Sequence, residues 1–231
     1  MNEDSWALDN FGGVGRLFPL PNLVMFPHVV QPLHIFEPRY RDMTADALAG
    51  DHLIAMALLR PEWEHDYEGR PAIDPVICLC RIVADQKLDD GRYLLLLRGL
   101  TRGRVAEELA PEKLYRQARI ELTPERFELD LAQSRRFRGE LSELILPHFA
   151  GSDNAAAQVR DLFQGETPLG TLCDCLSYQL PLELARKQEL LAEAEVGQRA
   201  QKLIAALREV LPSSGSAGAS NRSFPPDFSL N

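Results

Sequence analysis

The stretch RLFPLPNLVMFPHVVQPLHIFEPRY, residues 16–40, decides the fold of this chain. Prolines at positions 19, 21, 27, 32 and 38 interrupt its apolar segments. Each proline inside a helix removes a hydrogen-bond donor and clashes with the preceding turn, so prolines this close together exclude a helix. The stretch instead predicts two short strands, Leu17–Leu20 and Val29–Phe36, joined by a proline-bent crossing. Pro38 then occupies the first turn of a helix, where its missing N–H costs nothing.

The rest of the first half consists of short apolar segments separated by turn residues. Arg39–Leu48 has apolar residues at helical spacing and is stopped by Gly50. Asp90-Gly91 is a strong signal for a hairpin turn. Short strands bounded by turns at this spacing predict a barrel or a sandwich. The further strands are expected over residues 52–59, 76–84, 93–97, 104–108 and 115–122.

The spacing of the apolar residues becomes helical after Thr123-Pro124. The first helical pattern runs to Phe149, and Pro147 is expected to kink or end it. Thr167-Pro168 provides an N-cap and a first-position proline for a later helix. The remaining helices are expected over residues 155–163, 169–180, 182–195 and 197–211.

These patterns divide the chain into four segments. Residues 1–13 form an N-terminal arm, which Trp6 and Phe11 are expected to pin to the rest of the protein. Residues 14–122 form the strand-rich unit and residues 123–211 a helical subdomain. Residues 212–231 are rich in Ser, Gly and Pro, and we predict that this tail is disordered.

Several motifs, taken together and in order, resemble one family. They are Phe18-Pro19-Leu20, Pro27, Pro32-Leu33, His34–Tyr40, Arg81-Ile82-Val83, Asp90-Gly91-Arg92, Arg98–Arg102, Leu180-Pro181-Leu182 and Lys187–Glu193. Over roughly Val14–Leu211 the chain resembles the N-terminal, substrate-binding domain of Lon proteases. The resemblance implies an α+β fold, in which a small, mostly antiparallel PUA-like β-barrel of about six strands precedes a C-terminal helical bundle subdomain of four or five helices.

The resemblance implies a function in protein or peptide binding rather than catalysis. The sequence has no G-x-x-x-x-G-K-[ST] loop, which an ATPase module would need. Its four lysines, Lys87, Lys113, Lys187 and Lys202, lie in polar connections or on charged helix faces, where we expect no desolvated base. We therefore predict a stand-alone module that is not an enzyme, with neither a Ser–Lys peptidase site nor a cofactor.

The charge of the chain bears on its partners. Its net charge is −9, and the excess acid is spread over both halves. An evenly acidic chain is a poor candidate for binding phosphate backbones, so RNA binding, which a PUA-like barrel suggests, is the less favoured alternative. No apolar run approaches the ~20 residues that span a bilayer. The N-terminus, MNEDSWALDN, is unlike a signal peptide, and we expect no membrane partner and a cytoplasmic location.

The four cysteines occur as two closely spaced pairs, Cys78/Cys80 and Cys173/Cys175. A zinc site of four thiolates normally uses C-x-x-C turns, and neither pair has that spacing. We interpret the four residues as buried, reduced thiols and expect no bound metal.

The cluster His34, Glu37, Arg39 and Tyr40 allows two interpretations. As a catalytic group, His34 and Glu37 would be an acid–base pair of a hydrolase of unknown substrate, for which the loop that carries His65 is the other possible site. As a structural group, Glu37 would cap the helix that follows or pair with Arg39 or with a strand arginine such as Arg81. We favour the structural interpretation. It also covers Gly99 and the pair Lys187-Gln188, which is expected at an interface between barrel and helices.

The peptide-binding surface is expected at one end of the barrel. Strands such as 76–84 and 93–97 are expected to be occupied by their own pairing and core. What remains is the crossing over residues 22–28, with Phe26 and His28, and the loop Pro61–Pro75, with Trp63 and Tyr67. Loops held on a rigid scaffold commonly carry binding groups, and aromatic residues are the usual anchors.

The expected partners are unfolded or tagged protein segments, or a protease or adaptor protein. Glu62, Glu64, Asp66 and Glu68 surround Trp63 and favour segments that are basic as well as apolar. Phe26 and Trp63 are expected to be exposed anchors, so that replacing either with Ala weakens binding and leaves the melting temperature nearly unchanged. If they instead cover the barrel as lids, both replacements lower the melting temperature.

Overall fold

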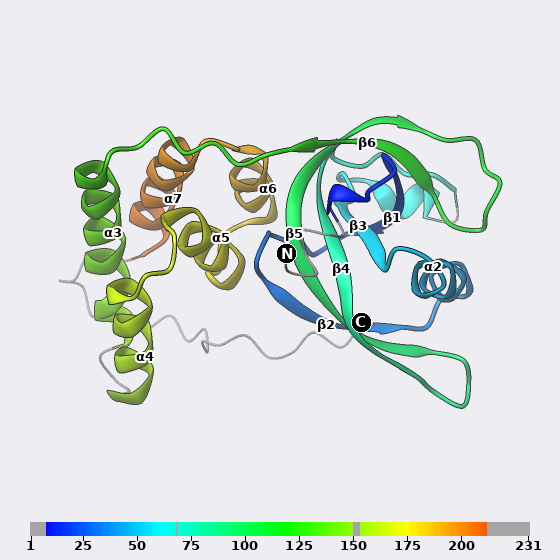
Figure 1. Ribbon diagram of the computed structural model, residues 1–231, viewed down its shortest axis with the longest axis horizontal. Helices are drawn as coiled ribbons and strands as arrows, with labels where there is room; N and C mark the ends of the chain where they lie inside the picture. The colour runs from blue at the N-terminus through cyan, green and yellow to red at the C-terminus, as the bar shows by residue number, and fades with distance from the viewer. Residues whose placement is uncertain (1–7, 68, 150–152, 212–231) are drawn as a thin grey trace.

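Six strands form one sheet in a computed structural model that describes residues 8–67, 69–149 and 153–211 (Figure 1). Their order is β2-β5-β4-β3-β1-β6, and a further pairing of β5 with β6 closes the sheet into a barrel. The strands are β1 Val14–Leu20, β2 Val30–Ile35, β3 Leu53–Leu58, β4 Val76–Lys87, β5 Tyr93–Glu108 and β6 Gln117–Thr123. β1 and β3 run parallel and the other pairs antiparallel, which confirms the mostly antiparallel barrel.

The long strand β5 organises the barrel. The first half of β5 pairs with β2 and the second half with β6, while β4 pairs with β5 over residues 93–104. The expectation of two separate strands, 93–97 and 104–108, is therefore wrong. β5 carries two glycines, Gly99 and Gly103, and a glycine inside a strand commonly marks a close approach of neighbouring groups. At Gly103 a Cβ atom would lie 2.8 Å from the side chain of Ile120 on β6.

The sheet is apolar on both faces. Every residue of β3 is buried, because its alternate side chains join two different clusters. Leu53, Ala55 and Ala57 belong to the smaller cluster, against which Leu8 and Phe11 of the N-terminal arm pack. The expected role of Phe11 is thus confirmed, whereas Trp6 lies outside the described residues, as does the tail predicted to be disordered. The other side chains of β3 belong to the larger cluster, which continues into the helical half.

The proline-bent crossing between β1 and β2 packs directly against β5. The backbone N–H of His28 donates to the Gly99 carbonyl at 2.8 Å, and the Gly99 N–H donates to the Val29 carbonyl at 2.9 Å. His28 has a φ of 67°, which is uncommon for a residue other than glycine. A Cβ atom on Gly99 would lie only 2.0 Å from the carbonyl oxygen of Phe26. Only glycine therefore allows the crossing to approach β5 this closely.

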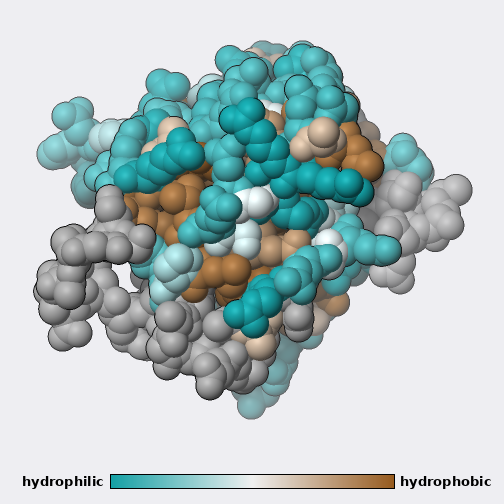
Figure 2. Space-filling view, turned by 90° about the vertical axis from the view of Figure 1, so that its left-hand side faces the viewer, coloured by the Kyte–Doolittle hydropathy of each residue, from teal (hydrophilic) through white to brown (hydrophobic). Residues whose placement is uncertain are grey.

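The helices follow the sequence pattern with shifts of a few residues. α2 begins at Pro38, as predicted, and α3 gives way to a 3-10 turn over Leu146–Phe149, near the predicted break at Pro147. At α5 the N-cap is Pro168 rather than Thr167. The helices are α2 Pro38–Leu48, α3 Leu131–Ile145, α4 Asp153–Gln164, α5 Leu169–Gln179, α6 Leu184–Ala192 and α7 Val196–Val210. Seen from the side of α3 and α4, apolar surface lies between many polar side chains (Figure 2).

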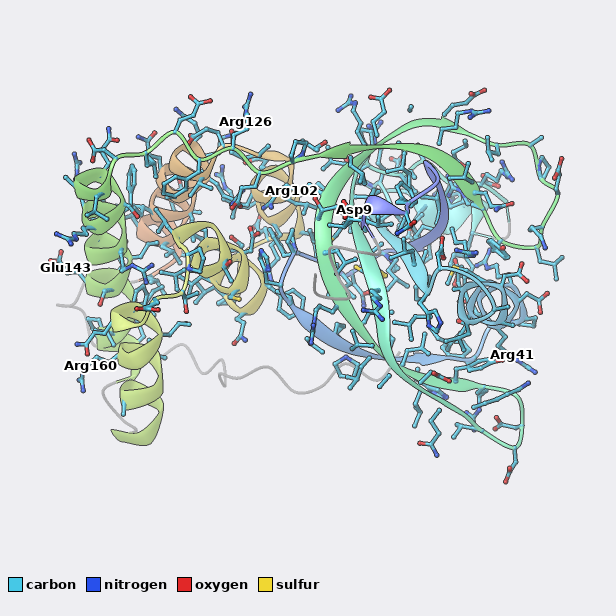
Figure 3. The ribbon with its side chains drawn as sticks, in the orientation of Figure 1. Asp9, Arg41, Arg102, Arg126, Glu143 and Arg160 are labelled. Carbon is cyan, nitrogen blue, oxygen red and sulfur yellow. The ribbon has the colours of Figure 1, made fainter. Side chains whose placement is uncertain are left out.

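A buried cluster of charges joins the barrel to the helices. Arg102 on β5 binds Asp174 on α5 with two hydrogen bonds, of 2.5 and 3.1 Å, and its Nε donates to the Leu191 carbonyl at 2.8 Å. Arg199 on α7 lies with its Nε 3.2 Å from Asp174, and it also binds Glu125 in the connection between the halves. Both arginines and Asp174 are buried. Figure 3 shows Arg102 at the border of the two halves.

Replacing Gly99 with Ala tests the close approach of the crossing. The added methyl group overlaps the backbone of Phe26, and backbone cannot move aside as a flexible side chain does. We expect Gly99→Ala to lower the free energy of unfolding by about 2 kcal/mol or more, as overpacking of a core does.

Gly139→Ala is the matched control, measured by the same urea denaturation. Gly139 lies on α3, and a methyl group added there would meet no atom within 4 Å, so Ala should stabilise the helix by about 1 kcal/mol. Equal stabilities for the wild type and Gly99→Ala would show that the crossing adjusts freely.

Candidate functional site

The stretch Phe36–Tyr40 builds a polar network at the start of α2. Glu37 is the N-cap residue of α2 by its backbone, but its side chain makes no capping hydrogen bond, so the expectation of a side-chain cap is wrong. Its carboxylate instead accepts from the Nε of Arg39 at 3.0 Å and from the hydroxyl of Tyr67 at 2.6 Å. The expected ion pair of Glu37 with Arg39 is confirmed. The hydrogen bond from Tyr67, in the long loop, was not predicted.

Arg39 holds the long loop against α2. Its guanidinium lies 4.9 Å from the ring centre of Tyr40 and 4.7 Å from that of Tyr67. It also donates to the Tyr67 carbonyl at 3.3 Å. Burial raises the pKa of the Tyr67 hydroxyl, and the hydrogen bond to Glu37 raises it further. Tyr67 therefore stays a protonated donor at neutral pH, and the network behaves as a structural tie.

A cavity of about 600 Å³ lies beside this network. It is rich in proline, tyrosine and arginine, and its lining includes Leu114, one of the most exposed large apolar side chains of the described residues. The polar groups of its wall are already engaged: Arg116 binds Glu108 and the Pro71 carbonyl, and Lys113 pairs with Asp46 at 3.0 Å. A ligand in this cavity would have to compete with those contacts.

The structure separates the residues that were expected to form one barrel end. Phe26 is completely buried in the larger core cluster, so the expectation of an exposed anchor is wrong, and Phe26→Ala would destabilise the fold. His28 is exposed, as a residue of the crossing, and no residue of 22–28 lines the cavity. Trp63 is half-buried and packs edge-on against Tyr67, with ring centres 5.3 Å apart. Trp63 lies on a 3-10 turn, Trp63–Asp66, within the loop.

An exposed apolar surface lies instead on strands β2 and β5. Pro32 faces Leu96 across the two strands, and His34 faces Leu94. Side chains of a strand alternate between the two faces, and Tyr93, Leu95 and Leu97 are buried while Leu94 and Leu96 point outward. We call this surface the β2–β5 strip. Its large apolar residues, between 38 and 49% exposed, are Val30, Leu94 and Leu96 on the two strands, with Phe36 directly after β2 and Val83 on the adjacent strand β4.

The strip was missed because YLLLL reads as a continuous apolar run. We expected residues 93–97 to be occupied by pairing and core, and this holds only for every second side chain. The alternation of the neighbouring strand, in which Val30, Pro32 and His34 face one side, was the signal that could have located the surface. Locating the surface also requires the register of β2 against β5, which cannot be read from the sequence alone.

His34 and Glu37 do not form an acid–base pair in the described part of the chain. The ring of His34 lies on the strip, 6.0 Å from the ring of Phe36, and its buried Nε2 has no hydrogen-bond partner among the described residues. Both carboxylate oxygens of Glu37 are engaged by Arg39 and Tyr67. The arrangement that motivated the hydrolase alternative is therefore not present.

The pair Lys187-Gln188 lies where the helices meet the barrel. The Gln188 Nε2 donates to the Val76 carbonyl on β4 at 2.7 Å, and the Lys187 Nζ donates to the Tyr178 carbonyl on α5 at 2.5 Å. The Tyr178 hydroxyl in turn donates to Gln31 on β2. Burial lowers the pKa of Lys187 to about 8, so this lysine is more desolvated than we expected for a residue on a charged helix face. Arg81, the other strand residue of the predicted structural group, is half-buried on β4 and lies opposite Leu53 on β3.

The cysteines occupy the core. Cys78, Cys80 and Cys173 are buried, Cys175 is partly buried, and all four are free thiols, as expected. Burial raises the pKa of the Cys173 thiol to about 12. Over residues 8–67, 69–149 and 153–211, no group of three or more His, Cys, Asp or Glu side chains could hold a metal ion. Within the same residues, no helix is both long and apolar enough to cross a membrane.

Comparison with known proteins identifies the family of this chain. The sequence pattern of the ATP-dependent protease La (LON) substrate-binding domain matches residues 15–209. The chain belongs to this family. It is 27% identical over 198 residues to the Lon protease of Anaeromyxobacter dehalogenans, covering 84% of this chain and 23% of that protein. With Lon protease 2 of Herpetosiphon aurantiacus it shares 27% identity over 218 residues, covering 90% and 26%. The chain thus spans about a quarter of the length of these relatives.

Two solved structures have the same fold. The N-terminal domain of a Mycobacterium avium complex Lon protease superposes with a TM-score of 0.67 and 16% identity, covering 86% of this chain and all of that domain. A Lon N-terminal domain protein from Xanthomonas campestris gives a TM-score of 0.61 and 22% identity, covering 83% and 97%. The match to the family pattern thus shows the family, and the two superpositions show that the chain has the α+β fold of a Lon N-terminal domain.

The lowered pKa of Lys187 predicts how the stability of this domain depends on pH. Between about pH 8 and pH 10.5 the unfolded lysine is charged while the folded lysine loses its proton, so the unfolded state binds more protons. The contribution of Lys187 to the free energy of unfolding therefore rises with pH in this window. Lys187→Met should show a smaller rise between pH 7.5 and 9.5 than the wild type, measured by urea denaturation.

Gln188→Met is the control for that measurement. It removes a hydrogen bond between helix and barrel but no titratable group, so it should lower stability by a similar amount at every pH. Parallel pH profiles for Lys187→Met and the wild type would contradict a desolvated Lys187.

Proposed function

We propose that this chain is a non-catalytic recognition module that binds extended apolar segments of unfolded or tagged proteins on the β2–β5 strip. The observation that carries the proposal is the strip itself, in a chain that belongs to a family of substrate-binding domains. In the proposed function, the bound segment is either passed to a protease or adaptor partner or simply held.

The physical character of the strip supports this assignment. Contiguous exposed apolar surface is costly in water and commonly marks an interaction site. The strip lies beside a sheet edge, because β2 pairs only with β5 among the described strands. An extended peptide can add to such an edge through main-chain hydrogen bonds while its alternate side chains contact the exposed face. Phe36 and the two outward-facing leucines of β5, Leu94 and Leu96, supply large anchors for that contact.

The cavity adjoins the strip rather than competing with it. Phe36 belongs to the strip and the next residue, Glu37, lines the cavity. A segment bound along β2 can therefore continue toward Trp63 and Tyr67, which we propose as additional contacts. At the other end of β2, His28 precedes the strand and is a further candidate contact. The cationic lining of the cavity, with Arg70 and Lys113 exposed, does not support a preference for basic segments.

Two other functions receive less support. A hydrolase that uses His34 and Glu37 would need them to act together, and they lie in different contacts. RNA binding would need a positive surface, whereas the chain carries a net charge of −9. We therefore propose neither catalysis nor nucleic-acid binding.

The double variant Leu94→Ser/Leu96→Ser tests the proposed site. Both side chains already face solvent, so the variant should keep the wild-type melting temperature within a few degrees. Binding of a fluorescently labelled, permanently unfolded protein, followed by anisotropy, should weaken at least tenfold, or about 1.4 kcal/mol.

Leu131→Ser is the matched control, since Leu131 is exposed on α3, away from the strip. It should bind like the wild type. If the double variant binds as tightly as the wild type, or if Leu131→Ser loses as much, the strip is not the recognition surface.

A further inference from the structure

The sequence that follows Leu211 contains an apolar motif behind a linker-like segment. Residues 212–223 read PSSGSAGASNRS, and residues 224–230 read FPPDFSL. Both segments lie outside the described residues. A composition of Ser, Gly and Ala is typical of linkers, whereas two Phe, one Leu and two Pro within seven residues are not. Residues 224–230 thus have the composition of a short recognition motif.

The described chain brings the start of this segment close to β2. Glu209, at the end of α7, lies 3.4 Å from Arg186 on α6. The next residue of α6, Lys187, binds Tyr178 on α5, and Tyr178 binds Gln31 on β2. Only two helices therefore separate the end of α7 from β2, and packed helices lie about 8–10 Å apart.

The linker-like segment is long enough for that distance. Twelve flexible residues have a root-mean-square span of roughly 17–21 Å, and about 40 Å when fully extended. The path from α7 over α6 and α5 to β2 has three steps of about 8–10 Å, or about 24–30 Å, which lies within the extended length of the segment. Residue 224 can therefore reach the β2–β5 strip, which starts next to Gln31, at Val30 and Pro32.

The strip suits this motif chemically. Phe228 and Leu230 are two positions apart, so in an extended segment both side chains point to the same side. The proline pair favours an extended conformation, which reduces the entropy lost on docking. The strip offers Leu94 and Leu96 as apolar contacts for these side chains.

We infer that residues 224–230 dock on the β2–β5 strip of their own chain and compete there with client segments. This inference rests on the proposed function for its consequence, although not for the docking itself. A short flexible linker gives an effective concentration of the order of 1 mM. A motif with a dissociation constant of about 100 μM would then occupy the strip most of the time and weaken client binding about tenfold. Only a client with several apolar segments would displace it readily.

A triple variant of the full chain, Phe224→Ser/Phe228→Ser/Leu230→Ser, tests the competition. It should bind a labelled unfolded protein about tenfold more tightly than the wild type, and amide hydrogen exchange at residues 30–36 should become faster. The control Ser213→Ala/Ser214→Ala/Ser216→Ala changes the linker-like segment alone and should change neither quantity. Unchanged exchange together with unchanged affinity in the triple variant would overturn the inference.

A synthetic peptide of residues 221–231 separates this inference from the proposed function. It should bind the triple variant, followed by fluorescence anisotropy of the labelled peptide, and lose at least tenfold affinity when Leu94→Ser/Leu96→Ser is added. If the peptide binds in this way but no unfolded protein does, the docking holds and the proposed function fails. If unfolded proteins bind and the peptide does not, or if it binds the strip variant equally well, the inference is wrong.

Discussion

Arg102 and Asp174 form the contact on which the arrangement of the whole domain depends. Removing two charges from water costs several kcal/mol for each ion, and their attraction offsets that cost only when the geometry is good and the remaining hydrogen-bond groups are satisfied. Here the guanidinium meets the carboxylate with two hydrogen bonds, and its third nitrogen binds a carbonyl of α6. Loss of one partner would leave an unpaired buried charge, which typically costs about 3–5 kcal/mol. The pair therefore strongly favours one relative position of β5 and α5.

The Arg102–Asp174 contact is connected to the proposed binding surface through strand β5. The strand that carries Arg102 in its second half carries Leu94 and Leu96 in its first half. α5, which carries Asp174, also carries Tyr178, whose hydroxyl binds Gln31 on β2. Both strands of the strip are thus held by the same helix. A recognition surface on a rigid scaffold loses less entropy when a flexible segment binds.

Local sequence signals predicted the elements, because prolines and turn residues act within a few positions of the chain. The spacing of prolines before Tyr40 indicated both strands and the start of α2, and Asp90-Gly91 indicated the hairpin, in which Gly91 has a φ of 81°. The site depended on contacts between distant residues. Whether Phe26 is buried is decided by β5, far downstream, and whether Leu94 is exposed is decided by which face of β5 the rest of the chain covers. Arg102 stood inside a recognised motif, but its partner Asp174 had no signal in the sequence.

The central claim is that apolar segments bind on the β2–β5 strip, and nuclear magnetic resonance of Leu and Val methyl groups tests it most directly. The full chain is titrated with a reduced, alkylated protein that cannot fold. The account predicts that the methyl signals of Val30, Leu94 and Leu96 shift first and by the largest amounts, while those of Leu79 and Leu203 in the core stay unchanged. Shifts confined to Leu114 and Leu59 would contradict it, because they would place the bound segment in the cavity beside Tyr67.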